Sequence, residues 1–122
     1  MKKGIILLGV LVALGLFLVA CDSGPSYDAE LVEEGQAVFL TNCSSCHGED
    51  ARGLPDAGKD LVGNEYILNT DDDELIVLIK VGRPIGDPEN TSGIDMPPKG
   101  GNPAMSDEDI FAVIAYLRSI QE

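Results

Sequence analysis

Two cysteines and the only histidine of the chain lie together in the sequence Cys43-Ser44-Ser45-Cys46-His47. Thiols three positions apart can form thioether bonds to the two vinyl groups on one edge of a porphyrin. The residue that follows then lies under the iron, where an imidazole is a good axial donor. The spacing therefore predicts covalent attachment of one haem through Cys43 and Cys46, with His47 as an axial ligand.

Two other uses of this cluster conflict with the rest of the sequence. A structural zinc site needs four protein ligands, and two Cys with a single His leave one ligand missing. A thioredoxin-type pair follows a strand and precedes a helix, whereas the pattern here predicts a helix before Cys43 and a loop after His47. A chance occurrence of the motif is the remaining alternative. Whether the protein is exported bears on this alternative, because bacteria attach haem outside the cytoplasmic membrane.

The N-terminal segment predicts export from the cytoplasm. Lys2 and Lys3 precede an uninterrupted apolar or glycine run from Gly4 to Ala20, which is typical of a signal peptide. This run of 17 residues is also at the short limit for a spanning helix, so length alone does not separate a cleaved signal from an anchor.

The end of this run resembles the bacterial lipobox, in which a small residue precedes a cysteine that receives a diacylglyceryl group before cleavage. The matching sequence is Leu18-Val19-Ala20-Cys21. We expect a signal peptide over 1–20, lipidation of Cys21 and a position on the extracytoplasmic face of the membrane; an ordinary signal or short anchor that ends in Cys is the alternative. Bacteria attach haem outside the cytoplasmic membrane, so the two signals agree, and no cysteine is left for a disulfide.

The mature chain is strongly acidic. All 21 Asp and Glu residues follow residue 21, and removal of residues 1–20 takes Lys2 and Lys3 away, which leaves 6 basic residues and a net charge of −15. Such a chain does not bind nucleic acid through a basic face and is repelled by an anionic bilayer. The charge indicates either a well-solvated surface or docking to a redox partner that carries a basic patch.

The 122 residues suffice for one domain and a targeting segment. Residues 22–28 have the composition of a linker, and apolar residues at helical spacing then predict a helix over 29–42. Thr70 or Asp71 is expected to cap a second long helix that ends at Gly82, and Ser106 to cap a last helix through Arg118. The Gly- and Pro-rich stretches 43–63 and 83–104 are predicted to be irregular loops wrapped around a cofactor.

With these features the chain resembles class I cytochromes c over roughly residues 28–120. The resemblance implies an all-α fold of three main helices, short helical turns and long loops around one covalent haem c, here in residues 29–122. It also implies that Gly35 permits a close crossing with the helix that carries Tyr116. The matching positions are Gly35, Phe39, Cys43, Cys46, His47, Gly58-Lys59-Asp60-Leu61, Met96-Pro97-Pro98 and Ala115-Tyr116-Leu117.

One departure from the family concerns the hydrogen bond to the axial histidine. Family members commonly have Gly-Pro-x-Leu where this chain has Gly58-Lys59-Asp60-Leu61, and the carbonyl of that Pro accepts a hydrogen bond from the His. Any residue supplies a carbonyl, so Lys59 can make the same contact, which orients the imidazole and raises its basicity. We assign no role to the Lys59 side chain.

Two methionines of the mature chain are candidates for the sixth ligand. Met105 directly precedes the N-cap Ser106 and has the spacing of a hydrophobic staple with Ile110, so it already has a structural role. Met96 lies in the long loop before two prolines that stiffen the chain. The Met-Pro pattern of the family favours Met96 as well.

Iron held by His47 and Met96 would have no open position, which predicts an electron carrier and no enzymatic activity. A haem enzyme or gas sensor needs a labile sixth site with nearby acid and base groups, and the chain has no second His. A tightly bound haem subunit of a larger oxidoreductase is the other alternative, and the residues do not decide between a subunit and a free shuttle.

Overall fold

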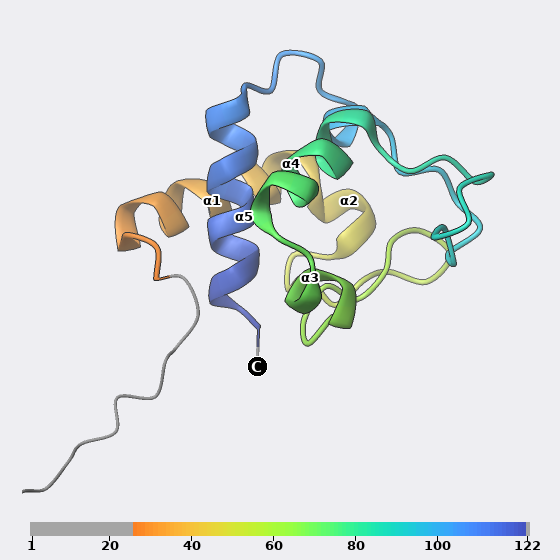
Figure 1. Ribbon diagram of the computed structural model, residues 1–122, viewed down its shortest axis with the longest axis horizontal. Helices are drawn as coiled ribbons and strands as arrows, with labels where there is room; N and C mark the ends of the chain where they lie inside the picture. Colours follow the sequence, from red (N-terminus) through yellow and green to blue (C-terminus); the bar gives the residue numbers. More distant parts are fainter. Residues whose placement is uncertain (1–25, 122) are drawn as a thin grey trace, which may run out of the picture.

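The computed structural model describes residues 26–121, which form helices joined by long loops (Figure 1). The predicted signal peptide and Cys21 lie outside the described residues. The only β-type pairing within residues 26–121 is an isolated antiparallel bridge between Arg83 and Met96, and the expected all-α fold is confirmed. The helices are α1 (Ala29–Asn42), α2 (Ser44–His47), α3 (Glu65–Asn69), α4 (Asp72–Val81), the 3₁₀ helix η1 (Pro98–Gly101) and α5 (Asp107–Ser119).

Capping signals predicted the start and end of α4 and the start of α5, while α5 ends at Ser119, one residue after the predicted Arg118. Of the two candidate caps of α4, Asp71 is the one used, since its side chain accepts a hydrogen bond from the Glu74 amide. Gly82 ends this helix with a φ of 73°, in the region that favours glycine. Ser106 caps α5 in a reciprocal arrangement with Asp109, whose carboxylate accepts a hydrogen bond from the Ser106 amide.

The three short helices match the short helical turns that the resemblance implied, while the residues by themselves indicated only irregular loops over 43–63 and 83–104. Helix α2 lies inside the first stretch and η1 inside the second, and α3 lies between the first stretch and α4. Each has only four or five residues, too few for a period of 3.6 to be visible in the sequence. Helix α3 nevertheless has an ordinary cap, since the Asn64 side chain accepts hydrogen bonds from two backbone amides.

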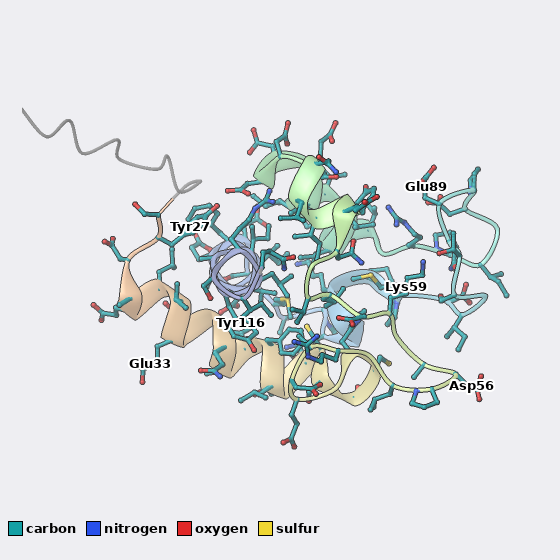
Figure 2. The ribbon with its side chains drawn as sticks, turned by 90° about the horizontal axis from the view of Figure 1, so that it is seen from below. Tyr27, Glu33, Asp56, Lys59, Glu89 and Tyr116 are labelled. Carbon is teal, nitrogen blue, oxygen red and sulfur yellow. The ribbon has the colours of Figure 1, made fainter. Side chains whose placement is uncertain are left out.

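Helices α1 and α5 cross closely, as the resemblance implied (Figure 1). A Cβ atom added to Gly35 would lie 1.8 Å from the Ala112 carbonyl oxygen, so only glycine permits this approach. The rings of Phe39 and Tyr116 pack across the crossing with centroids 5.3 Å apart, and Tyr116 lies between the two helices in Figure 2. The core continues along α5, where seven residues are buried.

The start of the described chain is held against α4 and α5. The Tyr27 hydroxyl donates a hydrogen bond to Asp72, and its ring packs edge-on against Phe111 with centroids 5.9 Å apart. Burial and the neighbouring Asp72 carboxylate raise the pKa of Tyr27 to about 12. Asp72 also pairs with Arg118 at 3.0 Å, which joins this segment to both α4 and α5.

None of the helices within residues 26–121 has the length and apolarity needed to cross a membrane.

Candidate cofactor site

A cavity of about 310 Å³ opens between the helices and the two long loops. This volume is at the lower end of the range of about 300–1,000 Å³ found for small-molecule and cofactor sites. Its lining includes Cys43, Cys46, His47 and Met96, so the thiols, imidazole and thioether that the sequence singled out all face one cavity.

The predicted attachment residues lie on one continuous helical path. The Cys43 amide donates to the Phe39 carbonyl at 2.8 Å, and the His47 amide donates to the Cys43 carbonyl at 2.9 Å. Residues three and four positions apart share a face of a helix, so Cys43 has Cys46 and His47 beside it. Burial, with a smaller contribution from Cys46, raises the pKa of the Cys43 thiol to about 11. A catalytic redox thiol has a lowered pKa, whereas the pKa of Cys43 is raised.

The imidazole of His47 is oriented by a backbone carbonyl. Its Nδ1 lies 2.9 Å from the Lys59 carbonyl oxygen, the contact expected from the sequence. Since a carbonyl only accepts, Nδ1 carries the proton and the lone pair is on Nε2, where it is available to a metal. Gly58 makes this possible, because a Cβ atom there would lie 2.6 Å from the Cys46 carbonyl oxygen and 3.0 Å from His47 Nδ1.

Met96 reaches the cavity through a different set of contacts. Its backbone exchanges two hydrogen bonds of 2.9 Å with Arg83. A Cβ atom on Gly82 would lie 2.3 Å from the Met96 carbonyl oxygen, so the glycine that ends α4 also lets the Met96 loop approach. Met105 is only 2% exposed, belongs to the core cluster with Ile110, and is absent from the cavity lining.

The loop after Met96 is tied to the helix that precedes the attachment motif. Asn102 donates a hydrogen bond from Nδ2 to Asn42 Oδ1 at 3.0 Å. A Cβ atom on Gly100 would lie 2.8 Å from the Asn42 carbonyl oxygen. Asn42 directly precedes Cys43, so these contacts fix the Met96 loop relative to the attachment residues.

Arg83 is a residue of this cavity that sequence reasoning missed. Its side chain lines the cavity, and Nε is buried without a hydrogen-bond partner among the described residues. The only signal in the sequence is its place directly after the helix stop Gly82, which does not show where the side chain points.

The helical fold and a cavity lined by two thiols, an imidazole and a thioether define a small haem-binding electron-transfer domain. A model of the family described as Cytochrome c matches residues 32–121. The chain belongs to this family.

Similar proteins include subunits of cbb3-type cytochrome c oxidases and cytochromes cL. The chain is 33% identical over 99 residues to the cbb3-type cytochrome c oxidase subunit CcoP of Rhodobacter capsulatus, covering 80% of this chain and 32% of that protein. It is 31% identical over 61 residues to the subunit FixP of Rhizobium meliloti, covering 50% of this chain and 21% of that protein. The chain thus spans a third or less of these relatives.

Solved structures of cytochromes cL have a fold similar to that of this chain. Cytochrome cL of Methylophaga aminisulfidivorans superposes with a TM-score of 0.56 at 27% identity, covering 79% of this chain and 57% of that one. Cytochrome cL of Hyphomicrobium denitrificans gives a TM-score of 0.55 at 26% identity, covering 75% and 48%.

Family membership establishes covalently bound haem c, with its iron, as the cofactor. The cavity fits this group because it presents two thiols for thioether bonds, one imidazole with a free Nε2 and one thioether sulfur. The functional class is therefore electron transfer, as a carrier or as the haem subunit of an oxidoreductase.

Proposed function

We propose that this chain is a single-electron carrier in which Cys43 and Cys46 hold the haem and His47 and Met96 ligate the iron. The haem iron, when bound, supplies the chemistry by alternating between Fe(II) and Fe(III). The observation that carries the proposal is the hydrogen bond from His47 Nδ1 to the Lys59 carbonyl, since it directs Nε2 to the metal in a cavity that Met96 also lines. A His/Met pair leaves no position for a substrate or gas.

The residues around the ligands hold them in place. The Lys59 carbonyl orients the imidazole and increases its basicity, and the backbone pairing with Arg83 holds Met96. Apolar side chains, among them Phe39, Val113 and Leu117, line the cavity and keep water from the haem. A dry site with fixed ligands changes little when the iron changes charge, which is the property a carrier needs.

A role as the haem subunit of a larger oxidoreductase is the second candidate. The relatives that support it are subunits of cbb3-type oxidases. Both roles use the same ligands, and they differ only in whether the domain leaves its partner.

We also propose that the redox partner docks through a basic patch. Acidic side chains point outward from well-separated parts of the surface, as Glu33, Asp56 and Glu89 do in Figure 2. The attraction between such a surface and a cationic one is screened above about 0.1 M salt, where the Debye length is about 10 Å.

For a carrier we expect the detergent-solubilised holoprotein to purify alone and to be reduced by ascorbate in a one-electron step. Its oxidation by membranes of the source organism should then slow as ionic strength rises from about 0.01 to 0.3 M, by about tenfold or more. Stopped-flow absorbance of the haem measures both reactions. Co-purification with stoichiometric oxidase subunits would instead establish the subunit role, and a flat salt profile would contradict the basic patch.

The lipid anchor is a further part of the proposal, with the extracytoplasmic membrane face as its location. Two acyl chains on Cys21 give stable attachment, whereas one myristoyl chain binds only marginally. The predicted linker 22–28 is shortened by its own last residues, because Tyr27 is held against Phe111 and Asp72. Residues 22–26 span at most about 18 Å when extended, so the domain would remain close to the bilayer.

We expect Cys21→Ala to abolish incorporation of radiolabelled fatty acid and to alter precursor processing, while the haem spectrum stays the same because Cys43 and Cys46 are intact. Gel autoradiography and haem staining of the same samples measure the two effects. Acyl labelling that persists in the variant would refute lipidation at Cys21.

A further inference from the structure

Arg83 holds a buried donor that nothing in the described protein satisfies. Its side chain is 18% exposed, and Nε has no hydrogen-bond partner. A buried donor without a partner has lost its hydrogen bonds to water without replacement, and this cost is larger when the group is charged. Proteins rarely leave such a group unpaired, so the cavity that Arg83 lines is expected to receive an acceptor.

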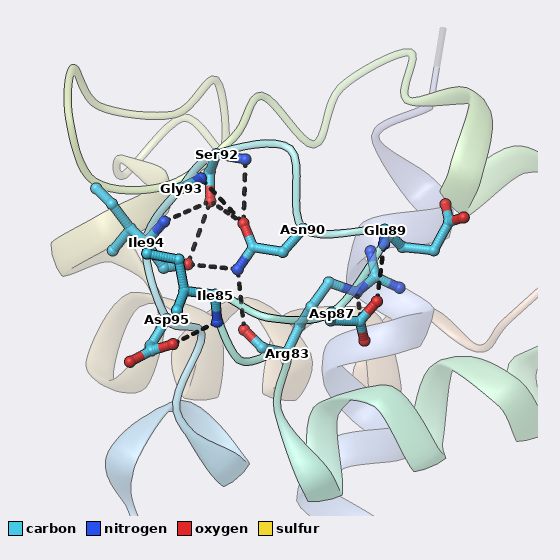
Figure 3. A network of polar contacts seen from close by, with 9 residues as sticks. All are labelled: Arg83, Ile85, Asp87, Glu89, Asn90, Ser92, Gly93, Ile94 and Asp95. Atoms are coloured by element: carbon cyan, nitrogen blue, oxygen red, sulfur yellow. Dashed lines mark hydrogen bonds and ion pairs between the residues drawn. The ribbon is translucent and has the colours of Figure 1, made fainter.

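The neighbours of Arg83 fix the guanidinium without bonding to Nε. The group lies over the Tyr66 ring, 4.5 Å from its centroid, a geometry that restrains the guanidinium plane. Asp87 Oδ2 is 3.9 Å from Nε, which is beyond hydrogen-bond distance. Its other oxygen, Oδ1, accepts a hydrogen bond from the Glu89 amide at 2.8 Å, so Asp87 is held by the loop (Figure 3).

Asn90 is not the missing partner either. Its Nδ2 donates to the carbonyls of Arg83 at 3.2 Å and Ile94 at 2.8 Å. Its Oδ1 accepts hydrogen bonds from Ser92 and Gly93 (Figure 3). Asn90 therefore closes the 84–95 loop beside Arg83 and leaves the guanidinium directed at the cavity.

The cavity has two long cationic side chains in its lining, Lys59 and Arg83. Lys59 is exposed and can be solvated, whereas Arg83 is largely buried. A guanidinium presents donors in a planar fork that matches a carboxylate. Haem carries two propionate carboxylates, which are anionic acceptors of this kind.

We propose that Arg83 binds a haem propionate, with Nε as one of the donors, and so acts as the counter-ion of the cofactor. This inference rests on the proposed function and names a further residue of the same site. The backbone of Arg83 pairs with Met96, so one residue connects the propionate to the loop of the sixth ligand. A cation paired in this way also disfavours the extra positive charge of Fe(III), and Arg83 therefore raises the reduction potential.

The direct test uses the unaltered ferrous holoprotein, which is diamagnetic. We expect nuclear Overhauser contacts between the Arg83 guanidinium protons and the propionate methylene protons, together with slow solvent exchange of the Nε proton. Absence of these contacts in a protein that keeps its Met-ligated haem spectrum would overturn the assignment of Arg83 and leave the carrier function intact. An unaltered holoprotein that does not have a Met-ligated haem spectrum would instead count against the proposed function.

Variants give the energetic test. Arg83→Gln should shift the ferric–ferrous equilibrium about tenfold toward Fe(III), a fall in potential of about 59 mV for one electron, and should alter the propionate bending mode in resonance Raman spectra. Arg83→Lys should recover most of the potential because it keeps the charge. The matched control is Lys80→Gln, which removes the same charge at a position three residues before Arg83. Lys80 pairs with Asp107, and neither residue lines the cavity. Equal shifts in Arg83→Gln and Lys80→Gln would contradict the proposal.

Discussion

Met96→Ala is expected to remove the Met-to-Fe(III) charge-transfer band and to lower the reduction potential by about 0.1 V or more, within the about 0.8 V over which axial ligands set haem potentials. A thioether ligand favours Fe(II), so its loss stabilises Fe(III). Met96 lines the cavity with His47 and is held there by its pairing with Arg83. Absorbance spectra and potentiometric titration of the purified holoprotein measure both effects.

The matched control is Met105→Leu, since Met105 is the other methionine of the predicted mature chain. It is 2% exposed in the core, where a swap of similar volume costs less than about 1.5 kcal/mol. We expect the charge-transfer band and the reduction potential of Met105→Leu to stay near those of the unaltered protein. The opposite pattern, with the band lost in Met105→Leu and kept in Met96→Ala, would reassign the sixth ligand to Met105.

Gly35→Ala is expected to destabilise the holoprotein by about 3 kcal/mol or more, since overpacking of a tight contact costs about 1–3 kcal/mol and occasionally more. The added Cβ would lie 1.8 Å from the Ala112 carbonyl oxygen and 3.0 Å from Tyr116 Cβ. Neither atom is the end of a flexible side chain, so α1 and α5 must separate. In a helix without this neighbour the same substitution would stabilise by about 1 kcal/mol, and the sign of the effect therefore reports the crossing.

Gly86 provides the control for this substitution. A Cβ atom at Gly86 meets nothing within 4 Å, and Gly86 is not among the residues with positive φ. Gly86→Ala should leave stability unchanged or raise it by about 0.4–1 kcal/mol. Thermal unfolding of both variants, followed by circular dichroism, should show a fall in Tm of more than about 10 °C for Gly35→Ala alone. Equal Tm values would show that the two helices tolerate the extra methyl group.

Local features of the sequence determined the long helices and the attachment motif. The apolar period of 29–42 predicted α1 with its observed bounds, and Ser106 predicted the start of α5. These predictions succeed because caps and helix faces depend on residues only three or four positions apart. The Cys43, Cys46 and His47 motif is local in the same sense, since one helical turn places its members together.

Contacts between distant parts of the chain were decided only by the tertiary structure. The sequence offered a carbonyl at Lys59, but the fold brings it to 2.9 Å from the imidazole twelve residues earlier. Helix α3 gave no periodic signal, and its Asn64 cap became visible only once the chain was folded. Arg83 is the clearest case, because a residue after a helix stop is ordinarily exposed. Its burial follows from pairing with Met96, thirteen positions away, and no local pattern of charge or polarity encodes such a long-range contact.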